Sequence, residues 1–311
     1  MNLQQLEYIV AIDSHRHFVT AANKCFVTQA TLSMMIKKLE EELGVKIFDR
    51  SRQPVVPTQA GAAVIAQAKI ILQQAKHMKE IVQELKGELK GELKIGIIPT
   101  VAPYLLPLFL NNFLKKYPLL KIKITELTTE QIIEKLKHHQ LDAGILATPL
   151  NNAAIKELPL YYEQFVVYAS KDEKLMKKKF LLPGDIDTNH LWLLEEGHCL
   201  RAQVLNLCEL RKKELETSNL EYEAGSIDTL KKMVDMNKGI TILPELAIKE
   251  LTASEKKQVR HFKPPVPVRE ISIVTYHHFV KQRMIDVLKE GITNSIPAEM
   301  LSVKRKMVTE I

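Results

Sequence analysis

The fold of the N-terminal part is decided by the stretch Phe18-Val-Thr-Ala-Ala-Asn-Lys-Cys-Phe-Val-Thr-Gln-Ala-Thr-Leu-Ser-Met-Met-Ile-Lys-Lys-Leu-Glu-Glu-Glu-Leu43. Ala21 and Ala22 are small enough to let two helices cross closely, and Thr28 is a favourable residue to cap a new helix. Behind that cap an apolar stripe repeats at helical spacing, at Leu32, Ile36, Leu39 and Leu43. The stretch therefore predicts two short helices joined by a tight turn.

The opposite face of the second helix carries short or flexible polar groups. These are Gln29, Thr31, Ser33, Met34 and Lys37. Such side chains suit the major groove of DNA, and a helix of this length fits there. A plain solvated face would have the same composition, so periodicity alone leaves both interpretations open.

The wider pattern resembles the winged helix-turn-helix of LysR-type regulators. It continues through Leu43-Gly-Val-Lys-Ile-Phe-Asp-Arg50 and Pro57-Thr-Gln-Ala-Gly61. The resemblance implies that residues 1–58 are a DNA-binding domain and that double-stranded promoter DNA and RNA polymerase are partners. The residues that it places on DNA are Thr28, Gln29, Thr31, Ser33, Met34 and Lys37 of the recognition helix, and Arg50, Arg52 and Gln53 of the wing.

Residues 59–90 read as one long helix followed by a hinge. Its apolar residues are spaced by alternating fours and threes, at Val64, Ala68, Ile71, Ala75, Met78, Val82 and Leu85. A sustained heptad seam of this kind faces a partner helix, which predicts a dimer. The alternative is a helix packed on its own domain. The glycines of Lys86-Gly-Glu-Leu-Lys-Gly91 mark the hinge.

Residues 91–296 alternate buried strands with helices. Strands are predicted at 93–98, 122–126, 143–147, 165–169, 191–194, 240–243 and 271–275, and helices at 129–138 and 226–236. This is the α/β pattern of a mainly parallel sheet, which binds ligands where its strands end. Thr100 and Thr129 fall at such positions. Residues 297–311 read as a basic, frayed tail.

The composition and the first residues predict the cellular compartment of the protein. The 311 residues carry a net charge of +7, which permits nucleic-acid binding without requiring it, and the charges within residues 1–58 nearly balance. No signal peptide is recognised, and the apolar stretch 95–113 is broken by three prolines. A cytoplasmic protein that touches no membrane is expected. In that reducing compartment a disulfide is more often transient and functional than structural. Cys25 is expected to be a core thiol, and no metal site or cofactor is predicted.

A second resemblance lies in Leu194-Glu-Glu-Gly-His-Cys-Leu-Arg201 and the cysteine at 208. Together with Ile98-Pro-Thr-Val-Ala-Pro-Tyr-Leu-Leu-Pro107, Gly225-Ser-Ile-Asp-Thr-Leu230 and Gly239-Ile-Thr-Ile-Leu-Pro244, this run is similar to the OxyR class of hydrogen-peroxide sensors. The resemblance implies that Thr100, Thr129 and His198 hold peroxide beside Cys199. It also implies a homotetramer that activates oxidative-stress genes.

For the regulatory domain, residues 91–296, the resemblance implies two Rossmann-like subdomains arranged as in periplasmic binding proteins. The first would comprise about 91–162 and 268–296, and the second about 163–267. The sequence departs from the class pattern in a longer, charged loop at 209–222, in Glu221 where a histidine is usual, and in Tyr276 where a basic residue is expected.

The chemistry of the two cysteines follows from their setting. Thiolate, not thiol, attacks peroxide, and His198, Arg201 and a helix start at Gly197 favour thiolate at Cys199. Glu195 and Glu196 act in the opposite sense, so the net effect on the pKa is left open. Attack would give a sulfenic acid, which Cys208 resolves to a disulfide.

The spacing of the two cysteines makes this reaction a switch. If residues 197–210 are helical, nine residues separate Cys199 from Cys208 by about 13.5 Å along the axis. A disulfide needs Cα atoms about 5.5–6 Å apart. The helix must then unwind before the bond can close.

Three alternatives compete with the sensor. Two buried cysteines without a redox role are possible, and so is a LysR-type regulator that answers a small metabolite in the cleft. An enzyme, a thiol peroxidase with Cys199 as nucleophile, would leave the helix-turn-helix unexplained.

Overall fold

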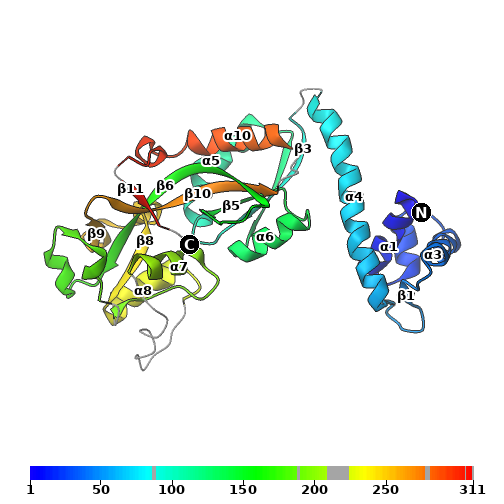
Figure 1. The fold of residues 1–311 in the computed structure, drawn as a ribbon, viewed down its shortest axis with the longest axis horizontal. Helices are drawn as coiled ribbons and strands as arrows, with labels where there is room; N and C mark the ends of the chain where they lie inside the picture. The colour runs from blue at the N-terminus through cyan, green and yellow to red at the C-terminus, as the bar shows by residue number, and fades with distance from the viewer. Residues whose placement is uncertain (86–88, 188–189, 209–223, 277–280, 305, 310–311) are drawn as a thin grey trace. The chain divides into compact units, whose positions relative to one another are not determined.

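The computed structural model describes residues 1–85, 89–187, 190–208, 224–276, 281–304 and 306–309 (Figure 1). The chain divides into two compact units, Met1–Gly87 and Glu88–Ile311. Among the described helices none is both long and apolar enough to cross a lipid bilayer.

The first unit is a helix-turn-helix with a two-stranded wing. Its elements are α1 (Leu3–His15), α2 (Phe18–Lys24), α3 (Gln29–Leu43), the antiparallel pair β1 (Phe48–Asp49) and β2 (Val56–Pro57), and α4 (Gln59–Leu85). The Thr28 side chain caps α3 by accepting the Thr31 N–H, and Ala21 and Ala22 are buried where α2 meets the other helices. Cys25 is half-buried and packs against this core. The predicted fold of this part is confirmed.

The heptad seam of α4 does not face outward along its whole length. Ala68 is buried, and Val64 and Ile71 pack against the core that α1 completes. The reason is that α1 lies along the first half of α4 and covers it, which the sequence pattern did not reveal. Further along, Met78 leaves 64% of its surface exposed. The side chains of Val82 and Leu85 lie outside the described residues.

The second unit is built on one continuous mixed sheet, in the order β4-β3-β5-β10-β6-β9-β7. Its strands are β3 (Gly91–Ile97), β4 (Leu120–Glu126), β5 (Ala143–Thr148), β6 (Ile155–Ala169), β7 (Phe180–Leu181), β8 (Ile240–Pro244), β9 (Val259–Phe262) and β10 (Val266–Tyr276). Strands β3, β4 and β5 are parallel, but β10 pairs antiparallel to both β5 and β6. The expectation of a mainly parallel sheet is therefore wrong. Residues 191–194 form only isolated bridges at Leu191 and Leu194.

Helices cover both faces of the sheet (Figure 1). The longer ones are α5 (Ala102–Lys116), α6 (Thr129–Lys137), α7 (Cys199–Leu207), α8 (Ile227–Asn237) and α10 (Gln282–Thr293), with a short α9 (Ala253–Lys256). Helix α6 packs closely because Gly96 and Gly144 lie beneath it. A Cβ added at either glycine would stand 2.8 or 2.5 Å from an Ile132 side-chain carbon. The two glycines thus let α6 pack directly against β3 and β5.

The expectation of a frayed C-terminal tail is wrong. A short 3-10 helix, η6 (Ala298–Leu301), buries Met300. The following strand β11 (Lys306–Val308) then pairs in parallel with β10. Backbone pairing with a central strand of the sheet holds this segment in place. Such pairing leaves no pattern in the side chains, so the sequence did not predict it.

Candidate thiol site and DNA-contacting surface

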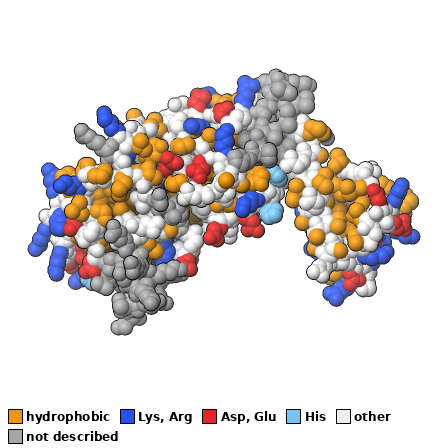
Figure 2. Space-filling view, viewed as in Figure 1, with side chains coloured by type: hydrophobic (Ala, Val, Ile, Leu, Met, Phe, Trp, Pro, Cys, Tyr) orange, Lys and Arg blue, Asp and Glu red, His pale blue; other side chains and the backbone are white. Residues whose placement is uncertain are grey.

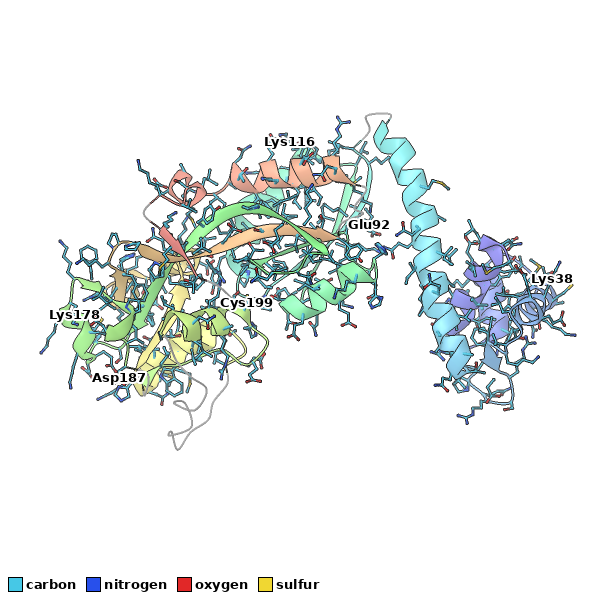
Figure 3. All side chains as sticks on the ribbon, viewed as in Figure 1. Lys38, Glu92, Lys116, Lys178, Asp187 and Cys199 are labelled. Atoms are coloured by element: carbon cyan, nitrogen blue, oxygen red, sulfur yellow. The ribbon has the colours of Figure 1, made fainter. Side chains whose placement is uncertain are left out.

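Cys199 is the first residue of α7 and lies in the interior of the second unit (Figure 3). Only 6% of its surface is exposed. His198 precedes it as the N-cap residue, and Gly197 supplies a left-handed φ of +92° in the turn that enters the helix. The sulfur therefore lies where the unpaired N–H groups of a helix start favour negative charge.

Two other elements of the unit, α6 and β5, contribute groups to the same sulfur. Thr129 is the first residue of α6, and its side chain interacts with the thiol, as do the backbone N–H groups of Ala147 in β5 and Leu200. The Thr129 hydroxyl is buried, and within the described part of the chain it has no partner at full hydrogen-bond geometry. A buried hydroxyl with spare hydrogen-bonding capacity next to a thiol is a place for a small polar ligand.

A fully buried cation completes the site. Arg269 of β10 forms an ion pair with Glu163, its cross-strand partner in β6, at 2.8 Å. Its Nη1 donates a hydrogen bond to the Thr100 hydroxyl, and Nη2, which also faces Glu163, donates one to the Thr100 carbonyl, each at 3.0 Å. Glu163 in turn accepts a hydrogen bond from the Leu246 N–H at 2.8 Å. Arg269 thus links both long strands to the loop that carries Thr100.

Burial has the largest effect on the pKa of the Cys199 thiol. It raises the pKa of Cys199, against the opposing effects of the Arg269 charge, the Thr129 hydroxyl and the two backbone N–H groups. The sequence had left the sign of this balance open. In the described state the thiol is protonated at neutral pH, and the groups around it stabilise the thiolate once the proton leaves.

The cation beside Cys199 is not the one that the sequence suggested. Arg201 donates a hydrogen bond to the Leu194 carbonyl at 2.7 Å, and Arg269 is the charge that acts on the sulfur. Tyr276, which stands where a basic residue was expected, contacts the His139 ring instead. A signal for Arg269 was present, since a lone arginine in an apolar strand needs a buried partner.

His198 and Thr100 lie at this site with different surroundings. The His198 ring is buried, and its Nε2 lies 3.4 Å from a Glu195 carboxylate oxygen. The Thr100 hydroxyl already accepts the hydrogen bond from Arg269. Thr100 is therefore held by the cation, whereas Thr129 keeps its spare capacity.

Cys208 is the C-cap residue at the other end of α7. Its N–H donates to the Val204 carbonyl at 3.1 Å, so the helix is unbroken between the two cysteines. Burial raises the pKa of Cys208 to about 11. Nine helical steps place the two Cα atoms about 13.5 Å apart along the axis, too far for a disulfide. Residues 209–223, which include the longer loop and Glu221, lie outside the described residues.

The predicted DNA-contacting residues lie at the surface of the first unit. Those exposed are Thr28, Gln29, Thr31, Met34, Lys37, Arg50, Arg52 and Gln53, and Ser33 is half-exposed. The Thr28 and Thr31 hydroxyls hydrogen-bond to each other at 2.9 Å as part of the cap.

Arg50 connects the wing to the recognition helix. Its guanidinium forms an ion pair with Glu40 at 3.1 Å, donates to the Ser33 hydroxyl at 3.3 Å and lies over the Phe18 ring. The other Glu40 oxygen accepts hydrogen bonds from the backbone N–H groups of Ile47 and Phe48. Sequence reasoning missed Glu40, a buried carboxylate that holds the wing against α3.

A cluster of positive charge lies in the second unit, whereas the predicted DNA-contacting residues belong to the first. Exposed lysines cluster around β7 and β9 at one end of the second unit (Figure 2), at Lys171, Lys174, Lys177, Lys178, Lys179, Lys256, Lys257 and Lys263. Among the described residues no group of three or more His, Cys, Asp or Glu side chains is arranged to hold a metal ion.

Comparison with known proteins agrees with both units. Residues 3–62 match the family described as the bacterial regulatory helix-turn-helix protein, lysR family, and residues 86–293 match the LysR substrate binding domain. The "Hydrogen peroxide-inducible genes activator" of Haemophilus influenzae is 36% identical, with 88% of this chain and 90% of that protein covered.

The chain is also similar to solved structures of OxyR proteins. A full-length OxyR variant from Pseudomonas aeruginosa is 35% identical, with a TM-score of 0.73 over 94% of this chain and 98% of that one. A hydrogen-peroxide-bound OxyR mutant from Corynebacterium glutamicum is 29% identical, with a TM-score of 0.63 over 94% and 92%. The chain therefore belongs to the LysR family of bacterial regulators, in its OxyR branch.

Proposed function

We propose that this protein is a DNA-binding transcriptional regulator that senses hydrogen peroxide by forming a disulfide between Cys199 and Cys208. The observation that carries the proposal is the placement of these two thiols at opposite ends of one short helix. One of them is surrounded by groups that stabilise a thiolate. Neither a structural disulfide nor a simple binding pocket needs that arrangement.

The chemistry has two balanced steps. The Cys199 thiolate attacks one peroxide oxygen, the O–O bond breaks, and hydroxide leaves and takes up a proton to become water. The Cys208 thiol then attacks the sulfenic acid sulfur, a second water leaves, and the disulfide forms. Peroxide is reduced and the two thiols are oxidised.

Thr129 is the group best suited to orient peroxide, because its buried hydroxyl has no full hydrogen bond among the described residues. Thr100 would contact the same molecule from the Arg269 side, and His198 from the start of α7. The Arg269 charge would stabilise the anionic sulfur, and its N–H groups would stabilise the leaving oxygen.

Closing the disulfide requires α7 to unwind, and the two folds of this segment would select two DNA-binding states. We infer an activator of oxidative-stress genes that binds promoter DNA and contacts RNA polymerase in the reducing cytoplasm. It would form a dimer through α4, with the exposed Met78 in the contact, and assemble further into a tetramer. The protein would regulate rather than turn over peroxide as an enzyme.

The test compares DNase footprints of reduced and peroxide-treated protein on its own promoter. A footprint that changes in the wild type, but not in Cys199→Ser or Cys208→Ser, supports the proposal. A redox-indifferent footprint combined with thermal stabilisation by a small metabolite would instead support the metabolite-responsive regulator.

A further inference from the structure

The C-terminal strand lies against the helix that has to unwind. Strand β11 pairs with β10, and the Thr309 N–H continues the pairing by donating to the Val268 carbonyl at 2.8 Å. On its other side the Thr309 carbonyl accepts a hydrogen bond from the side-chain amide of Gln203 at 3.2 Å. Gln203 stands midway along α7, and none of its surface is exposed.

This contact is incompletely satisfied. The Gln203 carbonyl oxygen and the Thr309 hydroxyl are both buried, and neither finds a hydrogen-bond partner in the described part of the chain. Buried polar atoms without partners are costly, whereas the same atoms are well hydrated in water. One hydrogen bond holds α7 against the C-terminal strand. The two unpaired buried atoms make this contact easier to break than an apolar contact of the same size.

The same strand also adjoins the residue that supplies the cation. In the sheet, Val308 is the partner of Val268, the residue directly before Arg269. Arg269 is the charge that lowers the pKa of Cys199 against its burial. Residues 306–309 therefore contact both the segment between the two cysteines and the strand that acts on the sensing sulfur.

We infer that residues 306–309 are a latch that holds α7 in its helical, reduced form, with Gln203 as the positioning residue. Unwinding α7 must break the hydrogen bond from Gln203 to Thr309, so the latch adds to the barrier and stabilises the dithiol over the disulfide. This inference rests on the proposed disulfide between Cys199 and Cys208. It adds that the C-terminal strand sets the concentration of hydrogen peroxide at which the disulfide forms.

The experiment compares three forms of the full protein: a chain ending at Arg305, a chain ending at Glu310 and the variant Gln203→Ala. The readouts are the rate of disulfide formation with hydrogen peroxide and the midpoint potential of the thiol pair in thiol–disulfide buffers. Ending the chain at Arg305 removes β11 and should speed the reaction and stabilise the disulfide about tenfold, a potential about 30 mV more negative. The chain ending at Glu310 should behave as the wild type.

Gln203→Ala should shift both readouts in the same direction, and combining it with the short chain should add little, because both changes remove the same contact. Leu288→Ala is the matched control, since it removes a buried side chain from α10 of the same unit without touching α7. It should lower the thermal midpoint and leave the potential unchanged.

Two outcomes overturn the inference in distinguishable ways. If the full chain forms the disulfide at the same rate and potential as the chain ending at Arg305 and as Gln203→Ala, the latch is wrong and the proposed function stands. If the full chain forms no disulfide at all, the proposed function fails and the latch fails with it.

Discussion

At the scale of single residues, the reactivity of Cys199 depends on two opposing effects on its pKa, burial and the charge of Arg269. Burial raises the pKa of the thiol, and Arg269 opposes it from within an ion pair with Glu163. The carboxylate neutralises part of the charge that the sulfur would otherwise feel. The two members of the pair should therefore affect Cys199 in opposite directions.

We expect Arg269→Gln to slow the oxidation of Cys199 about tenfold or more, and Glu163→Gln to accelerate it. Removing the cation raises the pKa of the thiol further, whereas removing the carboxylate leaves the cation free to stabilise thiolate. Both variants leave a buried charge unpaired and should lose about 3–5 kcal/mol of stability. Stopped-flow measurement with peroxide separates the two effects, because rates that fall in both variants would show a merely structural role.

The raised pKa of Cys199 also fixes the sign of the pH dependence. Because thiolate is the nucleophile and the thiol is protonated at neutral pH, the thiolate fraction grows about tenfold per pH unit below the pKa. The rate of oxidation should rise with pH through the neutral range and level off only above the ordinary range of thiols. Rates measured at several pH values check this, and a rate that is flat from neutral pH upward would contradict the protonated resting thiol.

The sequence predicted local positions better than long-range contacts. Thr129 and Cys199 do lie at helix starts, which neighbouring residues indicate, whereas the roles of Thr129, His198 and the two cysteines toward peroxide were implied by the family resemblance and stay predictions. Arg269 and its contact with Thr100 were not predicted, since that contact joins residues far apart in the chain through the pairing of β10 with β6.

At the scale of elements, α7 is the helix that the proposed disulfide would unwind. It is short, and a helix of this length is marginal on its own, so its packing holds it together. Ala202 lies half-exposed within it, between the two cysteines. A change there alters the helix without touching the thiols.

Ala202→Gly should make the disulfide form about fivefold faster and lower its reduction potential. Glycine weakens a helix interior by about 1 kcal/mol, and the loss falls on the reduced form alone. Lys289→Gly is the control, because it places the same defect at a half-exposed position of α10. Equal rates for Ala202→Gly and the wild type would mean that unwinding of α7 does not limit the reaction.

Helix α3 is the second element that carries function. Gln29→Ala should cost about 1–3 kcal/mol in binding to the preferred promoter and relax base preference. Lys37→Ala should weaken binding to all sequences and reduce the salt dependence by about one ion. Salt titrations of DNA binding measure both. Lys38→Ala, at the neighbouring exposed lysine outside the predicted set, should have the smaller effect; a larger one would place the contact face elsewhere on α3.

The sequence predicted the elements whose side chains form an apolar pattern. It did not predict features that depend on backbone hydrogen bonding between distant segments. The strands at 93–98, 143–147 and 240–243 were found from their apolar runs, close to β3, β5 and β8. The antiparallel direction of β10 was missed, because strand direction leaves no mark in local hydrophobicity. Strand β11 was missed for the same reason, since backbone pairing alone fixes it.

At the scale of the whole molecule, the function requires two units to share one signal. The first unit presents α3 and a wing held by Glu40 and Arg50, and the second holds Cys199 and Cys208. Family resemblance predicted this division from motifs at both ends of the chain. The first half of the heptad seam of α4 packs in the core with α1 of the same chain, because a heptad pattern cannot tell a partner helix from a helix of its own domain.

In the proposed switch, hydrogen peroxide joins Cys199 to Cys208. The direct measurement is non-reducing peptide mapping after treatment of the reduced protein with stoichiometric hydrogen peroxide, alongside Cys199→Ser and Cys208→Ser. We predict a rapidly formed cross-linked peptide that contains both cysteines, absent from both variants, with Cys25 still free. Two free thiols after treatment, or a cross-link through Cys25, would contradict it.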